Sequence, residues 1–266
     1  MTTRLSDRTP ERPTALFIHG AFCRAQSLAN IVGAFEKADY QAHAPDLRHH
    51  TPPLEPGAVS SLGTTSIKTY VDDIAKFIDK LGEPPIIVGH SMGGLIAQML
   101  AAQGRAKALV LLAPSAPWGV LPGHWNELAS GFGLYINGHY WEQALIPTFE
   151  VASDLTLNRV PPEERRKTFE QMVPESGRAM FEIFQWWLDL SRATDVAADK
   201  VTCPIFCAAG ELDTLNPPDT VRRIAARYRG RATYRLYPEM GHWLVAEPGW
   251  QIIAGDALKW LDDIAG

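Results

Sequence analysis

Six short apolar runs, separated by stretches with helical spacing, constrain the fold of this chain more than any other feature. Runs of this length fit buried strands, and the stretches between them suit helices that cross from one parallel strand to the next. The alternation therefore predicts the α/β class, a mostly parallel sheet flanked by helices. The expected strands are 15–18, 41–45, 85–88, 108–113, 204–208 and 233–236.

The stretches between the runs carry apolar residues on one face. Within 67–81, apolar side chains recur at spacings of three and four, which indicates an amphipathic helix packed against the sheet. The other expected helices are 25–37, 92–103, 221–228 and 250–264. A chain of 266 residues is long enough to build one large core from these elements.

Residues 117–200 interrupt this rhythm. They show helix-like segments broken by Gly and Pro, without an alternating strand pattern, and they hold almost half of the chain's aromatic residues. We therefore expect a helical cap, or lid, at 117–200 whose inner face lines an apolar pocket. The core is then 14–116 together with 201–266. Residues 1–13 are polar and are expected to be a disordered or irregular lead-in.

The pentapeptide Gly89-His90-Ser91-Met92-Gly93 follows an expected strand and opens an expected helix. A G-x-S-x-G pattern in this setting is typical of a nucleophile elbow, a sharp turn that projects the serine hydroxyl clear of the sheet. Glycines at the flanking positions avoid collisions with neighbouring backbone. We therefore predict that Ser91 is a catalytic nucleophile.

A serine hydroxyl needs a general base to remove its proton, and histidine is the usual base. Of the 8 histidines, His242 stands in a loop after the last expected strand, where it can reach over the carboxyl ends of the strands. His90 lies inside the elbow with its side chain directed away from that of Ser91. His19 is expected to hold its own loop by a hydrogen bond. His242 is the predicted base.

The third catalytic residue must accept a hydrogen bond from the histidine and stabilise its cation. Asp213 follows the expected strand 204–208 in a neighbouring carboxyl-end loop, and Glu211 and Asp219 are the alternatives. The order serine, aspartate, histidine differs from the orders found in chymotrypsin and subtilisin. We predict that Asp213 orients His242.

A tetrahedral intermediate also needs N–H donors for its oxyanion. The backbone N–H of Met92, directly after the nucleophile, is one expected donor. The second is expected from the loop after the first strand, where Ala21 is chosen and Phe22 is the alternative.

Five segments in a fixed order make the chain resemble the α/β-hydrolase superfamily, in particular its small serine esterases. They are His-Gly-Ala-Phe at 19–22, Ala-Pro-Asp-Leu at 44–47, Gly-His-Ser-Met-Gly-Gly at 89–94, Gly-Glu-Leu-Asp at 210–213 and Gly-His-Trp at 241–243. The resemblance covers nearly the whole chain. It implies a mostly parallel eight-stranded sheet with a helical cap inserted between the sixth and seventh strands, where 117–200 falls. Many relatives carry glycines after the second segment, whereas this chain has Arg48-His49-His50-Thr51, so the resemblance does not predict that loop.

The leading interpretation is an enzyme of carboxylesterase type, which cleaves a small hydrophobic or aromatic ester through an acyl-enzyme and needs no metal or organic cofactor. A lactonase, thioesterase, amidase or carbon–carbon bond hydrolase would use the same triad. An acyltransferase or a non-catalytic ligand-binding protein is an alternative of another class. The residues expected to line the pocket are Phe22, His90, Trp118, Trp141, Trp186, Trp187 and Trp243.

The composition limits the partners of the chain. A net charge of −5 argues against nucleic acid and anionic membranes, because both reward basic patches. No apolar stretch approaches the roughly 18 residues of a membrane span, and no signal-peptide pattern stands at the start, so we expect a cytoplasmic protein. The three cysteines suggest neither a disulfide framework nor a zinc site. The expected partner is a small apolar ester, and the sequence favours neither a monomer nor a dimer.

Overall fold

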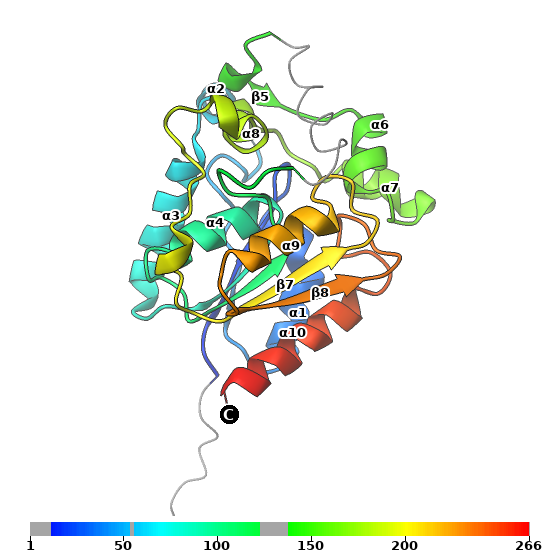
Figure 1. The fold of residues 1–266 in the computed structure, drawn as a ribbon. Coiled ribbons are helices and arrows are strands. Elements are labelled where there is room, and N and C mark those ends of the chain that lie inside the picture. Colours follow the sequence, from blue (N-terminus) through cyan, green and yellow to red (C-terminus); the bar gives the residue numbers. More distant parts are fainter. Residues whose placement is uncertain (1–11, 54–55, 123–137, 266) are drawn as a thin grey trace, which may run out of the picture.

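The six apolar runs form the strands of one sheet in a computed structural model, which describes residues 12–53, 56–122 and 138–265. All neighbouring strands are parallel, in the order β2-β1-β3-β4-β7-β8 (Figure 1). Each expected strand is confirmed to within two residues at either end. The strands are β1 (Ala15–Ile18), β2 (Ala42–His43), β3 (Ile86–His90), β4 (Ala108–Leu112), β7 (Ile205–Gly210) and β8 (Ala232–Tyr237).

The family resemblance implies an eight-stranded sheet. In the part of the chain that the structure describes, the main sheet has six strands instead. Residues 12–14, the described residues before β1, form no strand. The number eight came from the resemblance alone, whereas the sequence itself offers six apolar runs. The segment expected between the sixth and seventh strands accordingly lies between β4 and β7, the fourth and fifth strands of this sheet.

Helices cover both faces of the sheet, because successive side chains of a strand point to opposite faces. In β1, Leu16 and Ile18 join one buried cluster with α3, α4 and α9, while Ala15 and Phe17 join a second cluster with α1 and α10. The helices of the core are α1 (Ala29–Lys37), α2 (Pro56–Gly63), α3 (Ile67–Leu81), α4 (Met92–Ala101), α9 (Pro218–Ala226) and α10 (Trp250–Ala265). All were expected except α2.

The segment between β4 and β7 contains the residues expected to form the cap, and we call residues 117–200 the insertion. Its part 123–137 lies outside the described residues, as does nearly all of the expected lead-in 1–13. Figure 1 shows α6 (Phe149–Val151) and α7 (Pro162–Phe169) of the insertion beyond the ends toward which the arrows of β7 and β8 point. Its elements are β5 (Ala144–Leu145), α6 (Phe149–Val151), α7 (Pro162–Phe169), β6 (Glu175–Ser176) and α8 (Gly177–Phe184).

β5 and β6 form a small antiparallel ribbon that the sequence did not predict. Each of these strands has two residues, which is too short for an alternating apolar pattern to show.

A buried ion pair joins β6 of the insertion to the core. Glu175 Oε2 lies 3.0 Å from His50 Nε2, and both side chains are fully buried. Glu175 Oε1 accepts a hydrogen bond of 2.7 Å from the Tyr70 hydroxyl of α3. Burial opposes charge on both partners, but their attraction and hydrogen bonds outweigh it. The pKa of His50 is therefore raised and the pKa of Glu175 is lowered.

A second buried carboxylate joins α8 to the start of α3. Glu182 Oε2 accepts hydrogen bonds from the Ser66 hydroxyl at 2.9 Å and from the Ile67 backbone N–H at 2.8 Å. The carboxylate accepts a hydrogen bond from an N–H of the first helical turn that has no partner within the helix. Its negative charge also interacts favourably with the positive end of the helix dipole. The insertion is thus attached to the core by charged groups that are shielded from water.

Candidate active site

Ser91 lies at the turn between β3 and α4. Its backbone has φ 52° and ψ −118°, a strained conformation that costs a residue with a side chain on the order of 1–3 kcal/mol. The Ser91 N–H donates to the Leu112 carbonyl of β4, and the Ser91 carbonyl accepts from the Ser115 N–H, both at 3.0 Å. The sheet therefore holds the strained residue at the carboxyl ends of its central strands.

Gly89 and Gly93 allow this turn because backbone approaches both of them closely. A Cβ atom at Gly93 would lie 2.1 Å from the Ile18 carbonyl oxygen of β1, and one at Gly89 would lie 2.4 Å from the Gly93 carbonyl oxygen. Real Cβ atoms essentially never come within 3.0 Å of such atoms. The two glycines of the G-x-S-x-G pattern are therefore required by the packing of β1, β3 and α4.

His242 and Asp213 form a buried pair in loops that follow β8 and β7. His242 Nδ1 lies 2.9 Å from Asp213 Oδ2, and each residue is 3% exposed. The other Asp213 oxygen accepts hydrogen bonds of 2.9 Å from the backbone N–H groups of Leu215 and Asn216. A carboxylate only accepts hydrogen bonds, so the imidazole proton of the neutral histidine stands on Nδ1 and leaves Nε2 free to act as a base.

The two alternative acids make other contacts. Glu211 accepts a weak hydrogen bond of 3.4 Å from the Glu239 N–H, and Asp219 pairs with Arg222 on α9. The structure therefore brings Asp213 to His242, and neither Glu211 nor Asp219.

Ser91 and His242 line one cavity of about 390 Å³. No hydrogen bond joins their side chains, and both of these residues belong to the described part of the chain. A long contact between nucleophile and base is common in hydrolases without a ligand, where the bond shortens when the substrate binds.

Three backbone N–H groups at this cavity have no hydrogen-bond partner among the described residues: those of Ala21, Phe22 and Met92. Met92 opens α4, where N–H groups have no partner within the helix. All three expected oxyanion donors therefore lie at the cavity, and the choice between Ala21 and Phe22 stays open.

Two further histidines hold the surrounding loops. His19 Nδ1 donates to the Gly20 carbonyl and Nε2 accepts from the Leu47 N–H, which is the loop-holding role expected for it. Burial lowers the pKa of His19 to about 4 and that of His90 to about 3, so both rings are neutral at pH 7. His90 Nε2 lies 2.9 Å from the His242 carbonyl oxygen and donates to it.

The expected lining of the pocket is partly wrong. Phe22, His90 and Trp243 line the cavity of Ser91, but four tryptophans of the insertion do not. Trp118 packs edge-on against Trp186, and Trp141 packs against His139, Tyr140 and Phe181. Trp186 and Trp187 line a small hollow that adjoins this cavity, and the residues common to both are Ile183, Phe184, Leu215 and Asn216. The aromatic residues of the insertion mostly pack against one another, because their large flat faces gain most from mutual contact.

The insertion lines the cavity with aliphatic side chains that sequence reasoning missed. They come from β5, from the π-helical turn after α6 and from α8, with Ser115 and Asn216 adding polar groups from the core. Scattered aliphatic residues carry no sequence signal that separates a pocket wall from a core. These side chains include Leu145, Ile146, Val151, Leu155, Met180 and Ile183.

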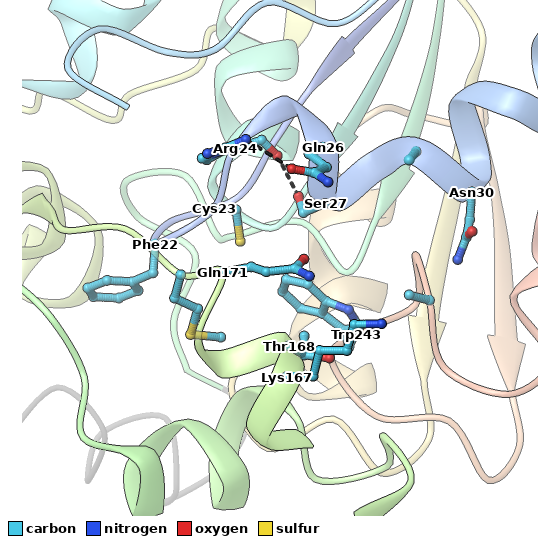
Figure 2. Close-up of a pocket in the computed structure, with 13 residues that line it drawn as sticks. Phe22, Cys23, Arg24, Gln26, Ser27, Asn30, Lys167, Thr168, Gln171 and Trp243 are labelled. Carbon is cyan, nitrogen blue, oxygen red and sulfur yellow. Dashed lines mark hydrogen bonds between the residues drawn. The ribbon is translucent and has the colours of Figure 1, made fainter. Parts of the chain in front are cut away.

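A second cavity, of about 330 Å³, adjoins the first at Phe22 and Trp243, which line both (Figure 2). Its wall is largely polar, and no acidic residue stands among the described residues that line it. Cys23 lies in this wall, and burial raises the pKa of its thiol to about 12. The thiol is therefore protonated at neutral pH and is a poor nucleophile. Other lining residues are Arg24, Gln26, Ser27, Asn30, Lys167, Thr168 and Gln171.

Among the residues that the structure describes, there is neither a cluster of metal ligands nor a membrane-spanning helix. No group of three His, Cys, Asp or Glu side chains is arranged to hold a metal ion. Within the same part of the chain, none of the helices has the length and apolarity needed to cross a membrane.

Comparison with known proteins gives partial sequence relatives and full-length structural ones. The chain is 33% identical over 86 residues to the pyrethroid hydrolase of Sphingobium wenxiniae, a match that covers 32% of this chain and 29% of that protein. It is also 33% identical over 107 residues to the putative esterase/lipase 2 of Mycoplasma pneumoniae, covering 39% and 38% of the two chains. Both matches thus span well under half of these relatives.

A solved structure extends the likeness over the whole fold. The monoacylglycerol lipase of Paleococcus ferrophilus superposes with a TM-score of 0.70 and 21% identity, covering 95% of each chain. At this identity the likeness shows the fold alone. The Alpha/beta hydrolase family matches the sequence over residues 15–251, from the first strand into the last helix. The chain belongs to the alpha/beta hydrolase family.

Proposed function

We propose that the protein is a serine hydrolase that cleaves carboxylic esters with an apolar acyl or alcohol part. One observation carries the proposal. Ser91, in a strained turn, shares a cavity with a histidine whose Nδ1 is held by a buried aspartate and whose Nε2 is free. This combination supplies a nucleophile, a base and an orienting acid, in the roles of a hydrolytic triad.

In the proposed acylation, Ser91 Oγ attacks the ester carbonyl carbon while His242 Nε2 takes the hydroxyl proton. Asp213 stabilises the imidazolium that forms, and its two backbone hydrogen bonds keep its carboxylate in place. The tetrahedral oxyanion accepts hydrogen bonds from Met92 N–H and from Ala21 or Phe22 N–H. Collapse of this intermediate breaks the bond to the alcohol oxygen, which leaves with the proton from His242.

In the proposed deacylation, His242 takes a proton from water, and the resulting hydroxide attacks the carbonyl of the acyl-Ser91. The acid leaves, and the proton returns to Ser91 Oγ. These steps use side chains and water only and require no metal or organic cofactor.

The walls of the cavity support an apolar substrate. Its lining is mainly apolar, and besides Ser91 and His242 it holds polar groups from the core (Ser115 and Asn216) and from the insertion (Thr148 and Thr156). Burial of hydrocarbon surface against these walls contributes about 25 cal/mol of binding free energy per Å². A sugar or a polyanion would instead lose hydrogen bonds to water at such walls. The names of the similar proteins, pyrethroid hydrolase, putative esterase/lipase 2 and monoacylglycerol lipase, agree with this choice.

We further propose that the insertion, residues 117–200, serves as a cap that sets substrate preference. Residues of β5, α6 and α8 line the cavity that Ser91 also lines. The buried contacts of Glu175 and Glu182 hold the insertion to the core. In this proposal the cap acts as a fixed wall that selects among acyl chains.

The test is hydrolysis of p-nitrophenyl esters from acetate to octanoate by wild type and by Ser91→Ala. We expect the wild type to be active and the variant to lose about 10⁴- to 10⁶-fold in kcat with its melting temperature kept, since Ser91 Oγ has no hydrogen bond to any residue that the structure describes. The chain-length profile then measures the depth of the cavity.

Other outcomes would redirect the proposal. Activity that survives in Ser91→Ala would refute the serine mechanism. A folded, inactive wild type would refute simple ester hydrolysis and direct parallel assays to lactones, thioesters, amides, carbon–carbon substrates and acyl transfer, which use the same groups.

A further inference from the structure

Glu247 is a buried carboxylate without a role in the mechanism above. It follows His242 by five residues in the loop between β8 and α10, and it is 1% exposed. Its Oε2 accepts a hydrogen bond of 2.6 Å from the Gly241 N–H, and its Oε1 accepts one of 2.8 Å from the Trp243 N–H. One carboxylate therefore spans the backbone on both sides of His242.

Hydrogen bonds to a carboxylate are short and about twice as strong as those between neutral groups. With both oxygens engaged, Glu247 restrains the Met240–Gly241 peptide unit and the His242–Trp243 peptide unit. His90 holds the His242 carbonyl at 2.9 Å, and Asp213 holds Nδ1 of the ring. The backbone and the ring of His242 are thus held by different groups, and Glu247 accepts from the N–H of the residue on each side of His242.

We infer that Glu247 is a positioning residue for His242, which fixes the backbone of the general base so that Nε2 stays aligned with Ser91 Oγ. This inference rests on the proposed function. Glu247 does not line the cavity of Ser91 and so does not contact substrate. It acts on the reaction only through His242, and a shift of about 1 Å in a catalytic group can cost about 10²-fold in rate.

Other contacts keep the loop folded without this carboxylate. Leu244 and Val245 are fully buried in the second core cluster. Arg159 of the insertion donates to the Glu239 carbonyl at the start of the loop. Loss of one Glu247 hydrogen bond is therefore expected to loosen His242 rather than to unfold the loop.

The experiment compares Glu247→Gln with wild type in ester hydrolysis, with Glu239→Gln as the matched control. A glutamine has one oxygen, so one of the two N–H groups loses its acceptor. Glu239 stands in the same loop, but its side chain is 80% exposed in a surface ion pair with Arg159. We expect kcat of Glu247→Gln to fall about 10- to 100-fold with KM within about twofold, and Glu239→Gln to match wild type.

A second readout is the rate at which a fluorophosphonate labels Ser91, which depends on the base but not on the ester. We expect it to fall by the same factor in Glu247→Gln. Rates are normalised to the end-point of labelling, so misfolded molecules do not count. Glu247→Ala removes both hydrogen bonds and is expected to lose more; if it does not fold, Glu247→Gln decides.

A folded Glu247→Gln with wild-type kcat and labelling rate would overturn the inference, as would a change in KM alone. Failure of the proposed function would show elsewhere. In that case wild type itself would not be labelled at Ser91, or Ser91→Ala would remain active.

Discussion

Breaking the buried pair His50–Glu175 should destabilise the protein far more than breaking the exposed pair Arg48–Asp73. In His50→Ala, Glu175 remains fully buried and keeps hydrogen bonds from Tyr70 and the Ser176 N–H but loses its counter-charge. Removing one partner of a buried pair costs about 3–5 kcal/mol. A chain of this size loses about 2 °C of melting temperature per kcal/mol, so we expect a drop of about 6–10 °C.

The control is Arg48→Ala. Arg48 makes two hydrogen bonds of 2.7 Å to Asp73, but the two side chains are 43% and 28% exposed. Exposed pairs contribute about 0–1 kcal/mol, so this variant is expected to lose about 2 °C or less. Thermal melts followed by far-ultraviolet circular dichroism measure both. Equal melting temperatures for His50→Ala and Arg48→Ala would refute the idea that the buried pair attaches the insertion.

The same pair predicts a pH dependence. The pKa of His50 is raised, so its stabilisation is full below its ordinary value of about 6.5 and is lost as pH rises through the folded value. The pKa of Glu175 is lowered, so its stabilisation is present above its ordinary value of about 4.5 and is lost as pH falls through the folded value. The difference in melting temperature between wild type and His50→Ala should thus be greatest near pH 5–6. A difference that grew toward pH 9 would contradict the raised pKa of His50, and one that grew toward pH 3 would contradict the lowered pKa of Glu175.

Three further tests, two of them with a control variant, address the site and its supports. Asp213→Asn should lower kcat about 10⁴-fold in ester hydrolysis by disturbing the tautomer of the base, and near-normal activity would assign the acid elsewhere. Gly93→Ala forces a Cβ to 2.1 Å from a carbonyl oxygen and should destabilise by at least about 1–3 kcal/mol in urea denaturation. Gly33→Ala, in the middle of α1 with nothing within 4 Å, should instead gain up to about 1 kcal/mol, and similar effects of the two alanines would count against the packing argument. Ile146→Ala removes part of the cavity wall and should lower kcat/KM for octanoate relative to acetate several-fold, as loss of about 1 kcal/mol of apolar contact implies. Trp187→Ala, outside that wall, should leave this ratio unchanged, and the reverse result would restore the tryptophans as pocket residues.

Much of the fold could be predicted from local pattern. The six strands of the main sheet and five of the core helices follow from apolar runs and helical periodicity, because burial on one or both faces leaves a regular spacing in the chain. The helix α3 begins and ends at the residues that the periodicity indicates. By contrast, α2 and the two-residue strands β5 and β6 were not predicted. Short or weakly patterned elements form through contacts with neighbouring elements, and such contacts leave no regular spacing in the sequence.

The proposed catalytic residues could be predicted from the sequence for a similar reason. Ser91 stands in a turn whose glycines are dictated by close backbone approach, and His242 and Asp213 each follow a buried strand. In a parallel sheet the carboxyl ends of the strands meet at one edge, so position along the chain translates directly into position at the site. The pairing of His242 with Asp213, rather than with Glu211 or Asp219, required the structure.

The sequence by itself thus determined the class of fold, the six strands of the main sheet and the candidate nucleophile, base and acid, because each of these leaves a local signature. Only the tertiary structure decided the walls of the cavity, the contact of Glu247 with the backbone around His242, and the buried pair of His50 with Glu175. That pair joins residues 125 apart in the chain. Such contacts depend on how separate elements pack in three dimensions. The sequence alone does not distinguish a buried, paired carboxylate from an exposed one, because its partner is distant along the chain.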